Sequence, residues 1–179
     1  MDKELADGQA RDGTQERLDA AVRLCAPGTA LRHALDMIIA GHLGALICIG
    51  DTENVLAAGD DGFKLDISFT ANRLFELSKM DGAIVVDKDL TRILRANFHL
   101  NPDPSLPTTE TGMRHRTAAR MSLLTKAVVI SVSQRRQVVN VFVGGRSYQL
   151  RTVAGLMVSV NQLLVSLQNT RTQLDRNLL

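Results

Sequence analysis

The sequence has few aromatic residues and no marked excess of charge of either sign. It contains five Phe, one Tyr and no Trp, which gives little support for recognition of single-stranded nucleic acid by base stacking. Its 21 basic and 19 acidic residues nearly balance, so no overall field favours nonspecific binding to nucleic acid. Any site for an anionic ligand must therefore be local.

Cysteines and long apolar segments are also scarce. Cys25 and Cys48 lie in apolar surroundings without CxxC spacing, and we interpret them as buried free thiols of a cytosolic protein. The apolar run at 44–50, GALICIG, is far too short to span a bilayer, and no signal-like segment stands at the N-terminus. The sequence predicts a cytoplasmic protein without membrane contact.

Several motifs that define common enzyme classes are missing. No GxxxxGK[ST] or GxGxxG occurs, which argues against P-loop and dinucleotide-binding folds. No HExxH or Cys/His spacing suits structural zinc, and no GxSxG suggests a serine nucleophile.

The apolar pattern predicts three parts: a flexible leader over 1–13, a domain over 14–151 and a C-terminal helix over 152–179. Within the domain, helical spacing recurs in 18–25, after the N-cap candidate Thr29, in 68–80 and after Gly112. Runs rich in β-branched residues predict strands at 45–49, 54–58, 83–87, 92–98, 127–133, 138–144 and 147–152. Because helices alternate with strands and close hairpins also occur, we expect one α/β domain with a mixed sheet.

The C-terminal segment carries apolar residues at heptad-like spacing from Val153 to Leu178. Two interpretations stay open. The helix can pack on the core of its own domain, or it can continue into a helical region or partner outside this chain.

The stretch TGMRHRTAARM at 111–121 gathers basic residues where a helix is predicted to start. Cations are normally disfavoured there because the first turn already carries partial positive charge. Gly112 allows close approach of a ligand, and Arg114 and Arg116 can present forked donors to phosphate oxygens. Either this turn binds an anion, or Glu110 or Asp103 neutralises the arginines.

Two further segments hold polar residues at the ends of predicted strands. In KMDGAIVVD, Asp81 precedes Gly82 and Ala83 and a buried strand, so its carboxylate can hold a divalent cation or a hydroxyl. Asp-Gly is also an ordinary turn signal. The segment SVSQRR at 131–136 is equally compatible with the rim of a polar pocket and with a simple turn.

With DGA at 81–83 and RHRTA at 114–118 both present, the sequence resembles the diadenylate cyclase (DAC) family. The resemblance covers roughly residues 15–170 and includes other stretches. These are APGTALR (26–32), GALICIG (44–50), ELSKMDGAIVVD (76–87), RANFHLNPDPSLPTTETG (95–112) and VISVS (129–133).

The resemblance implies a fold and an activity. The fold is a central mixed sheet of about seven strands surrounded by helices. The activity is condensation of two ATP into cyclic di-3′,5′-AMP with release of two pyrophosphates, dependent on Mg²⁺ or Mn²⁺. A catalytically silent nucleotide-binding sensor and an oligomerisation scaffold of the same fold are the alternatives.

The resemblance also implies roles for individual residues. Asp81 would bind the metal and help to activate the ribose 3′-hydroxyl, and His115 would position the phosphates by hydrogen bonding. Gln134 stands where the family has an acidic residue after the serine that Ser133 matches. The catalytic residues would be Asp81, Arg114, His115 and Arg116. The ATP-binding residues would be Gly82, Ala83, Leu100, Met113, Arg114, His115, Arg116, Thr117 and Ser133.

Because each site would hold one ATP and the product has two-fold symmetry, two protomers must face each other, and a monomer should be inactive. The resemblance implies a homo-oligomer, an octamer in the family. It also implies DNA binding only through a C-terminal helix-hairpin-helix region that this chain does not contain.

Overall fold

The computed structural model describes the backbone of residues 2–177 and the side chains of residues 13–152 and 156–176. The strands are β1 (Ala45–Ile49), β2 (Gly59–Asp60), β3 (Phe63–Ser68), β4 (Ala83–Val86), β5 (Arg92–Leu100), β6 (Val128–Ser133), β7 (Val138–Val143) and β8 (Arg146–Leu150). The helices are α1 (Asp2–Leu24), α2 (Ala30–Ala40), α3 (Thr52–Ala57), α4 (Ala71–Leu77), α5 (Met113–Leu124) and α6 (Val153–Asn177).

The strands form one eight-stranded mixed sheet in the order β2-β5-β4-β1-β6-β7-β8, and β3 also pairs with β5. β1 and β4 are parallel, whereas the other neighbouring strands are antiparallel. The predicted α/β fold with a mixed sheet is confirmed. β2 and β3 were not predicted from the sequence.

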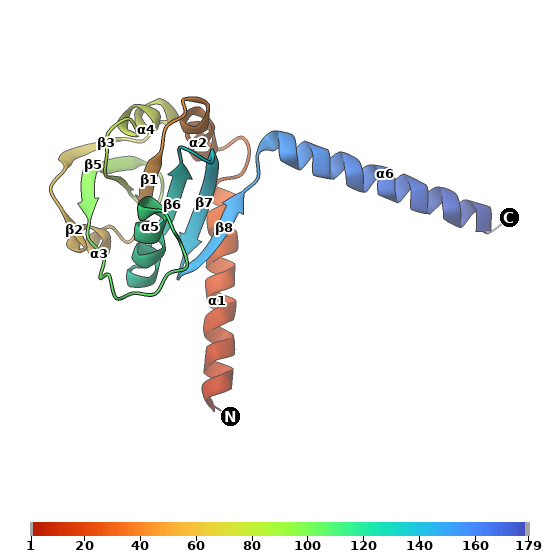
Figure 1. Ribbon diagram of the computed structural model, residues 1–179, viewed down its shortest axis with the longest axis horizontal. Coiled ribbons are helices and arrows are strands. Elements are labelled where there is room, and N and C mark those ends of the chain that lie inside the picture. Colours follow the sequence, from red (N-terminus) through yellow and green to blue (C-terminus); the bar gives the residue numbers. More distant parts are fainter. Residues whose placement is uncertain (1, 178–179) are drawn as a thin grey trace.

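Helices cover both faces of the sheet (Figure 1). The sheet separates the core into two clusters, one on each face. α1, α2 and α4 contribute to one cluster, which includes Leu35, Ile47 and Val141. α3 and α5 contribute to the other, which includes Met121 and Phe142. Both faces of the central strands are therefore buried, which explains why their sequences are continuously apolar.

The prediction of a strand at 54–58 is wrong, because most of this range belongs to helix α3. β1 already pairs with β4 on one side and β6 on the other, so no edge of β1 is free for a hairpin partner. The helix instead turns Val55 into the core, where its side chain is fully buried. The helix predicted at 68–80 is shorter than expected, because β3 extends to Ser68 and α4 begins only at Ala71.

Other local predictions are confirmed. Thr29 is the N-cap of α2, where its hydroxyl accepts a hydrogen bond from the Arg32 amide at 3.1 Å. Cys25 and Cys48 are buried free thiols. Burial raises the pKa of each to about 12, so neither is a reactive thiolate near neutral pH.

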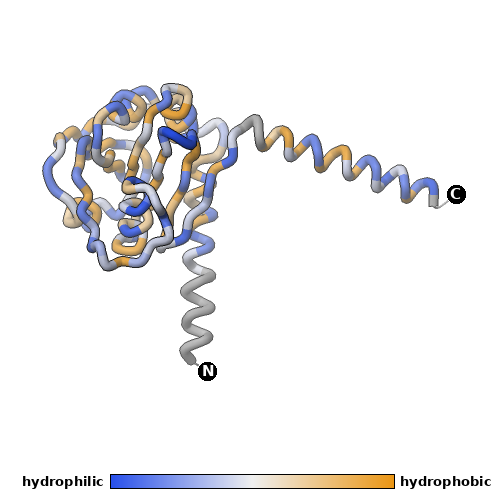
Figure 2. Tube along the Cα trace, viewed as in Figure 1, coloured by the Kyte–Doolittle hydropathy of each residue, from blue (hydrophilic) through white to orange (hydrophobic). Residues whose placement is uncertain are grey.

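The chain has a long helix toward each terminus. α1 begins at Asp2, so residues 2–13 of the range expected to be a flexible leader lie within its bounds. α6 leaves the domain as a single helix and points away from it (Figure 1). Most of its described side chains are exposed, among them Leu163 and Leu167, and apolar positions recur along it (Figure 2). The side chains of residues 156–176 therefore do not form part of the domain core, and the domain limits stay predictions.

The base of α6 is tied to α2. The buried guanidinium of Arg32 donates hydrogen bonds to Asp36 at 2.8 Å and to the Arg151 carbonyl at 3.0 Å, just before α6 begins. Among the helices of the described residues, none is long and apolar enough to cross a membrane.

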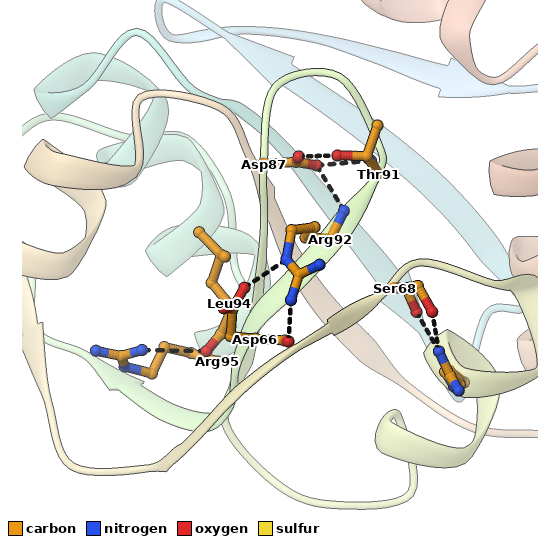
Figure 3. A network of polar contacts seen from close by, with 8 residues as sticks. Asp66, Ser68, Asp87, Thr91, Arg92, Leu94 and Arg95 are labelled. Carbon is orange, nitrogen blue, oxygen red and sulfur yellow. Dashed lines mark hydrogen bonds and ion pairs between the residues drawn. The ribbon is translucent and has the colours of Figure 1, made fainter.

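A polar network closes one edge of the sheet, at the turn from β4 to β5 (Figure 3). Asp87 accepts hydrogen bonds from the amides of Thr91 at 2.7 Å and Arg92 at 3.0 Å. Arg92 also pairs with Asp66 of β3. Partial burial acts to raise the pKa of Asp87, but these hydrogen bonds outweigh it and the pKa is lowered. Asp87 therefore stabilises the β4–β5 turn. The candidate site lies at the opposite ends of these strands.

Candidate functional site

The strand register brings distant parts of the sequence to that opposite edge. β1 and β4 begin there, since Leu46 pairs with Ala83, while the antiparallel strands β5 and β6 end there. Gly44 and Asp81, which precede β1 and β4, therefore lie at the same edge as Leu100 and Ser133. We call this the site edge.

Helix α5 starts above the site edge with an open N-terminus. Its N-cap is Gly112, whose side chain cannot cap the helix, and no acidic residue lies in the first turn. The first intrahelical bond runs from the Arg116 amide to the Gly112 carbonyl at 2.8 Å. The amides before Arg116 are thus helix-start donors without a side-chain acceptor, which is a favourable arrangement for an anion.

A cavity of about 490 Å³ lies between the start of α5 and the turn that joins β6 to β7. Its lining is strongly polar, with three arginines and one glutamate. The lining residues are Glu110, Thr111, Gly112, Met113, Arg114, His115, Ser133, Gln134, Arg135 and Arg136.

The arginines at this cavity have no acidic partner. Among the described side chains, the ion pairs are Arg32–Asp36, Lys79–Glu76, Arg92–Asp66 and Arg171–Asp175. Neither Glu110 nor Asp103 forms an ion pair with Arg114 or Arg116. The structure therefore does not support the alternative in which these acidic residues neutralise the arginines. The positive charge at the helix start therefore has no counter-charge among the described side chains, so an anionic ligand could supply one.

Arg114 is held against the backbone before β1. A Cβ added at Gly44 would lie 2.9 Å from the Cζ of Arg114 and closer still to Nη1. The absence of a side chain at Gly44 therefore creates the space that the guanidinium occupies. Sequence reasoning quoted the GALICIG run but did not identify this role, because nothing local indicates what lies against its first glycine.

His115 lies partly buried at the wall of the cavity. Its ring meets Phe142 edge-on, with centroids 6.3 Å apart, and its Nε2 is buried without a hydrogen-bond partner. Burial lowers the pKa of His115; Glu110 acts to raise it, but Arg136 and Arg114 lower it further. The imidazole is therefore mainly neutral at neutral pH, a state in which one ring nitrogen can donate a hydrogen bond and the other can accept one.

Asp81 has an exposed side chain with no hydrogen bond or ion pair among the described residues. Its carbonyl accepts a hydrogen bond from Asn97 Nδ2 at 2.8 Å, which fixes the backbone. Gly82 follows with a φ of +86°, and a Cβ there would lie 2.8 Å from the Asn97 carbonyl carbon. Only glycine suits this position, and the free carboxylate is presented at the site edge.

The structure separates the predicted residues into two groups. Met113, Arg114, His115 and Ser133 line the cavity. Asp81, Gly82 and Leu100 lie along the site edge outside it, whereas the side chain of Ala83 is fully buried in the core cluster beneath. β4 is two strands from β6, so Asp81 is roughly 10 Å from Ser133 across the sheet. Arg116 and Thr117 continue α5 beyond the lining.

For the segment 131–136, the sequence was compatible with the rim of a pocket and with a turn. In the structure its last four residues line the cavity, and three of these also belong to a turn. The Ser133 hydroxyl accepts a hydrogen bond from the Arg136 amide at 3.2 Å, and its carbonyl accepts one from Gln137 at 2.8 Å. These bonds close the turn that brings Arg135 and Arg136 to the cavity. Neither arginine was selected from the sequence as a site residue.

No group of three or more His, Cys, Asp or Glu side chains in the described part of the chain could hold a metal ion alone. This suits Mg²⁺ or Mn²⁺ bound together with a nucleotide, because such ions commonly use one or two carboxylates and complete their shell with phosphate and water. Asp81, whose carboxylate is exposed beside the site edge, could be one such ligand.

Comparison with known proteins gives consistent matches. Residues 32–147 match the model of the family DAC, described as DisA bacterial checkpoint controller nucleotide-binding. The chain is 47% identical over 166 residues to the DNA integrity scanning protein DisA of Corynebacterium glutamicum, covering 92% of this chain and 45% of that protein. It is 49% identical over 151 residues to DisA of Symbiobacterium thermophilum, covering 84% of this chain and 43% of that protein. The chain thus spans less than half the length of these relatives.

Solved structures of other proteins have a fold similar to that of this chain. A structure described as a hypothetical membrane spanning protein from Bacillus cereus has a TM-score of 0.60 and 25% identity, covering 69% of this chain and 62% of that one. DacA from Staphylococcus aureus has a TM-score of 0.55 and 20% identity, covering 77% of this chain and 89% of that one. The latter likeness concerns the fold alone.

Proposed function

Because the chain belongs to the DAC family, we propose that it is a diadenylate cyclase, a nucleotidyltransferase that condenses two ATP into cyclic di-3′,5′-AMP and two pyrophosphates. The observation that carries the proposal is the unpaired positive charge at the start of α5. Arg114 and the open helix start face a cavity of about 490 Å³, without an acidic partner among the described side chains. A triphosphate supplies the charge that is missing there.

The reaction needs this charge most at its transition state. The 3′-oxygen of one ATP attacks the α-phosphorus of the other, the bond to pyrophosphate breaks, and the 3′-proton is released. A second identical step closes the ring. Negative charge grows on the phosphoryl oxygens and on the leaving pyrophosphate, and preorganised donors stabilise such charge, typically by several kcal/mol in total. Arg114, Arg116 and the helix-start amides would supply these donors.

The remaining predicted residues fit a nucleotide laid along the site edge. We propose that Asp81 holds Mg²⁺ or Mn²⁺, which would neutralise phosphate charge and lower the pKa of the 3′-hydroxyl. We propose that the nucleotide lies against the backbone at Gly82 and Ala83, where the Ala83 side chain is buried and does not project toward it, and that Leu100 contacts the adenine. The span of roughly 10 Å from Asp81 to Ser133 matches a ligand larger than a single phosphate group.

A second copy of the chain completes the proposed site. Each copy presents one arginine-rich cavity at the start of α5, whereas the two-fold product needs two ATP molecules facing each other, so we propose activity only in a homo-oligomer such as an octamer. DNA binding would belong to a C-terminal region beyond the residues of this chain.

Incubation of the chain with ATP and Mg²⁺ or Mn²⁺, followed by chromatography, tests the activity. We expect cyclic di-AMP and two pyrophosphates per product molecule. ATP binding without product would favour the silent sensor, and assembly without ATP affinity would favour the scaffold.

Asp81→Asn tests the metal role. It should abolish synthesis while leaving the melting temperature and assembly unchanged, because the side chain is exposed and makes no contact that holds the fold. Asp89→Asn, which changes an exposed aspartate near the other end of β4, should retain full synthesis. Full synthesis by Asp81→Asn would refute the role of Asp81.

A further inference from the structure

Two buried polar side-chain atoms have no hydrogen-bond partner among the described residues. They are Nε2 of His115 and Oγ of Ser131. Ser131 is fully buried, whereas His115 reaches the cavity on one side. Since buried polar groups in proteins are almost always paired, two such atoms at one interface require an explanation.

Both atoms lie between α5 and the sheet. Side chains alternate along β6, so Ser131 points to the same face as Val129, which packs in the α5 cluster, and as Ser133, which lines the cavity. His115 contacts Phe142, the partner of Val129 in the register, and shares the cavity wall with Ser133. The imidazole therefore lies above the part of β6 that contains Ser131.

The two ring nitrogens of His115 face different surroundings. Nε2 is the buried atom. Nδ1 lies on the side of the helix start, 3.6 Å from where a Cβ on Gly112 would stand, and Gly112 lines the cavity. A hydroxyl can donate to the unprotonated nitrogen of a neutral imidazole, and the hydrogen bond made by one nitrogen decides where the proton resides.

We propose that Ser131 is a positioning residue for His115. Its hydroxyl donates to a bridging water that donates to Nε2, and this chain of hydrogen bonds keeps the proton on Nδ1. Nδ1–H then faces the cavity as a fixed donor for a phosphate oxygen. The identity of that acceptor rests on the proposed function, whereas the position of the proton does not.

The lowered pKa of His115 is consistent with this arrangement, since only a neutral ring can accept at Nε2 and donate at Nδ1. The charged groups that act on the ring are Glu110, Arg136 and Arg114. None of these charged groups forms a hydrogen bond with the buried Nε2. Ser131 Oγ, which is also buried without a partner, is the remaining candidate to donate a hydrogen bond toward it.

The experiment reads the tautomer directly by ¹⁵N NMR of the full 179-residue chain with labelled histidine, at neutral pH and without ligand. The His115 signals are assigned from their loss in His115→Gln, since the chain has only four histidines. We expect the proton on Nδ1 in the unmodified chain and a shift toward Nε2 in Ser131→Ala. A proton on Nε2 in the unmodified chain, or an unchanged tautomer in Ser131→Ala, would overturn the proposal.

Activity gives a second readout. Ser131→Ala should reduce the rate of cyclic di-AMP synthesis by roughly 10-fold, the lower end of what loss of a partner to the second nitrogen of a ligating histidine costs. Ser131→Thr, which keeps the hydroxyl, should restore the tautomer and most of the rate. Ser122→Ala is the control, because this buried hydroxyl donates to the Ala119 carbonyl at 2.7 Å and lies outside the cavity lining. An unmodified chain with the expected tautomer but no synthesis would contradict the proposed function and leave the Ser131 contact standing.

Discussion

Replacing Gly44 with alanine tests whether the position of Arg114 sets the affinity for ATP. The φ of Gly44 is not positive, so an alanine can adopt its backbone conformation without strain. The added Cβ would lie 2.9 Å from the Cζ of Arg114 and closer to Nη1, whereas ordinary contact begins at 3.4 Å. The guanidinium must therefore move, and because it is the end of a flexible side chain, the fold need not.

The expected loss follows from the bonds that Arg114 would make to phosphate. A hydrogen bond to a charged group contributes about 1.5–3 kcal/mol. Loss of one such bond lowers affinity by roughly 10- to 150-fold. We expect the effect of Gly44→Ala at the lower end of this range, because a displaced guanidinium still attracts phosphate.

Calorimetric titration with a non-hydrolysable ATP analogue measures the effect, and thermal unfolding checks the fold. Gly13→Ala is the matched control, since a Cβ there meets nothing within 4 Å. The double variant Gly44→Ala/Arg114→Ala should bind no worse than Arg114→Ala alone, because both changes act on one interaction. Unchanged affinity in Gly44→Ala, or additive losses in the double variant, would refute the reasoning.

Three further predictions concern the helix starts and the buried histidine. Arg114→Ala should weaken ATP binding more than Arg116→Ala does, since Arg114 lines the cavity and Arg116 does not. Equal losses of affinity in calorimetry would contradict this ranking. Thr29→Ala should lower the free energy of unfolding by about 1 kcal/mol in urea titration, because it removes the cap of α2. Because folding lowers the pKa of His115 from its ordinary value of about 6.5, the unfolded chain binds the proton first, and stability falls as pH drops below about 6.5. The difference in urea midpoint between the unmodified chain and His115→Gln should therefore change between pH 7.5 and 5.5, and a constant difference would count against the assignment.

The sequence predicted the central strands well because their signals are local. Runs such as 127–133 and 138–144 are apolar throughout and are bounded by turn residues. Val55 and Leu56, in contrast, suit a short strand or a short helix equally. The choice depends on whether β1 has a free edge, and only the register of β4 and β6 decides that. β2 was not predicted because it has only two residues, and β3 because its side chains are exposed or half-buried and form no continuous apolar run.

The site was predictable to a similar extent. The basic turn at 112–116 could be identified because its residues are neighbours in the chain, and the same holds for Asp81 and Gly82. The contact between Gly44 and Arg114 could not, since 70 positions separate them and no motif links them. The arrangement of Asp81 outside the cavity also depends on strand order, which the apolar pattern does not contain.

The turn at 134–137 lies between two cavities and contributes residues to both. Gln134, Arg135 and Arg136 line the arginine-rich cavity, whereas Gln137 lines a second one of about 360 Å³ together with Arg32 and Arg151. Arg32 also donates a hydrogen bond to the Arg151 carbonyl, where the chain leaves the domain for α6. The base of α6 and the start of α5 therefore border two cavities that are separated by this four-residue turn.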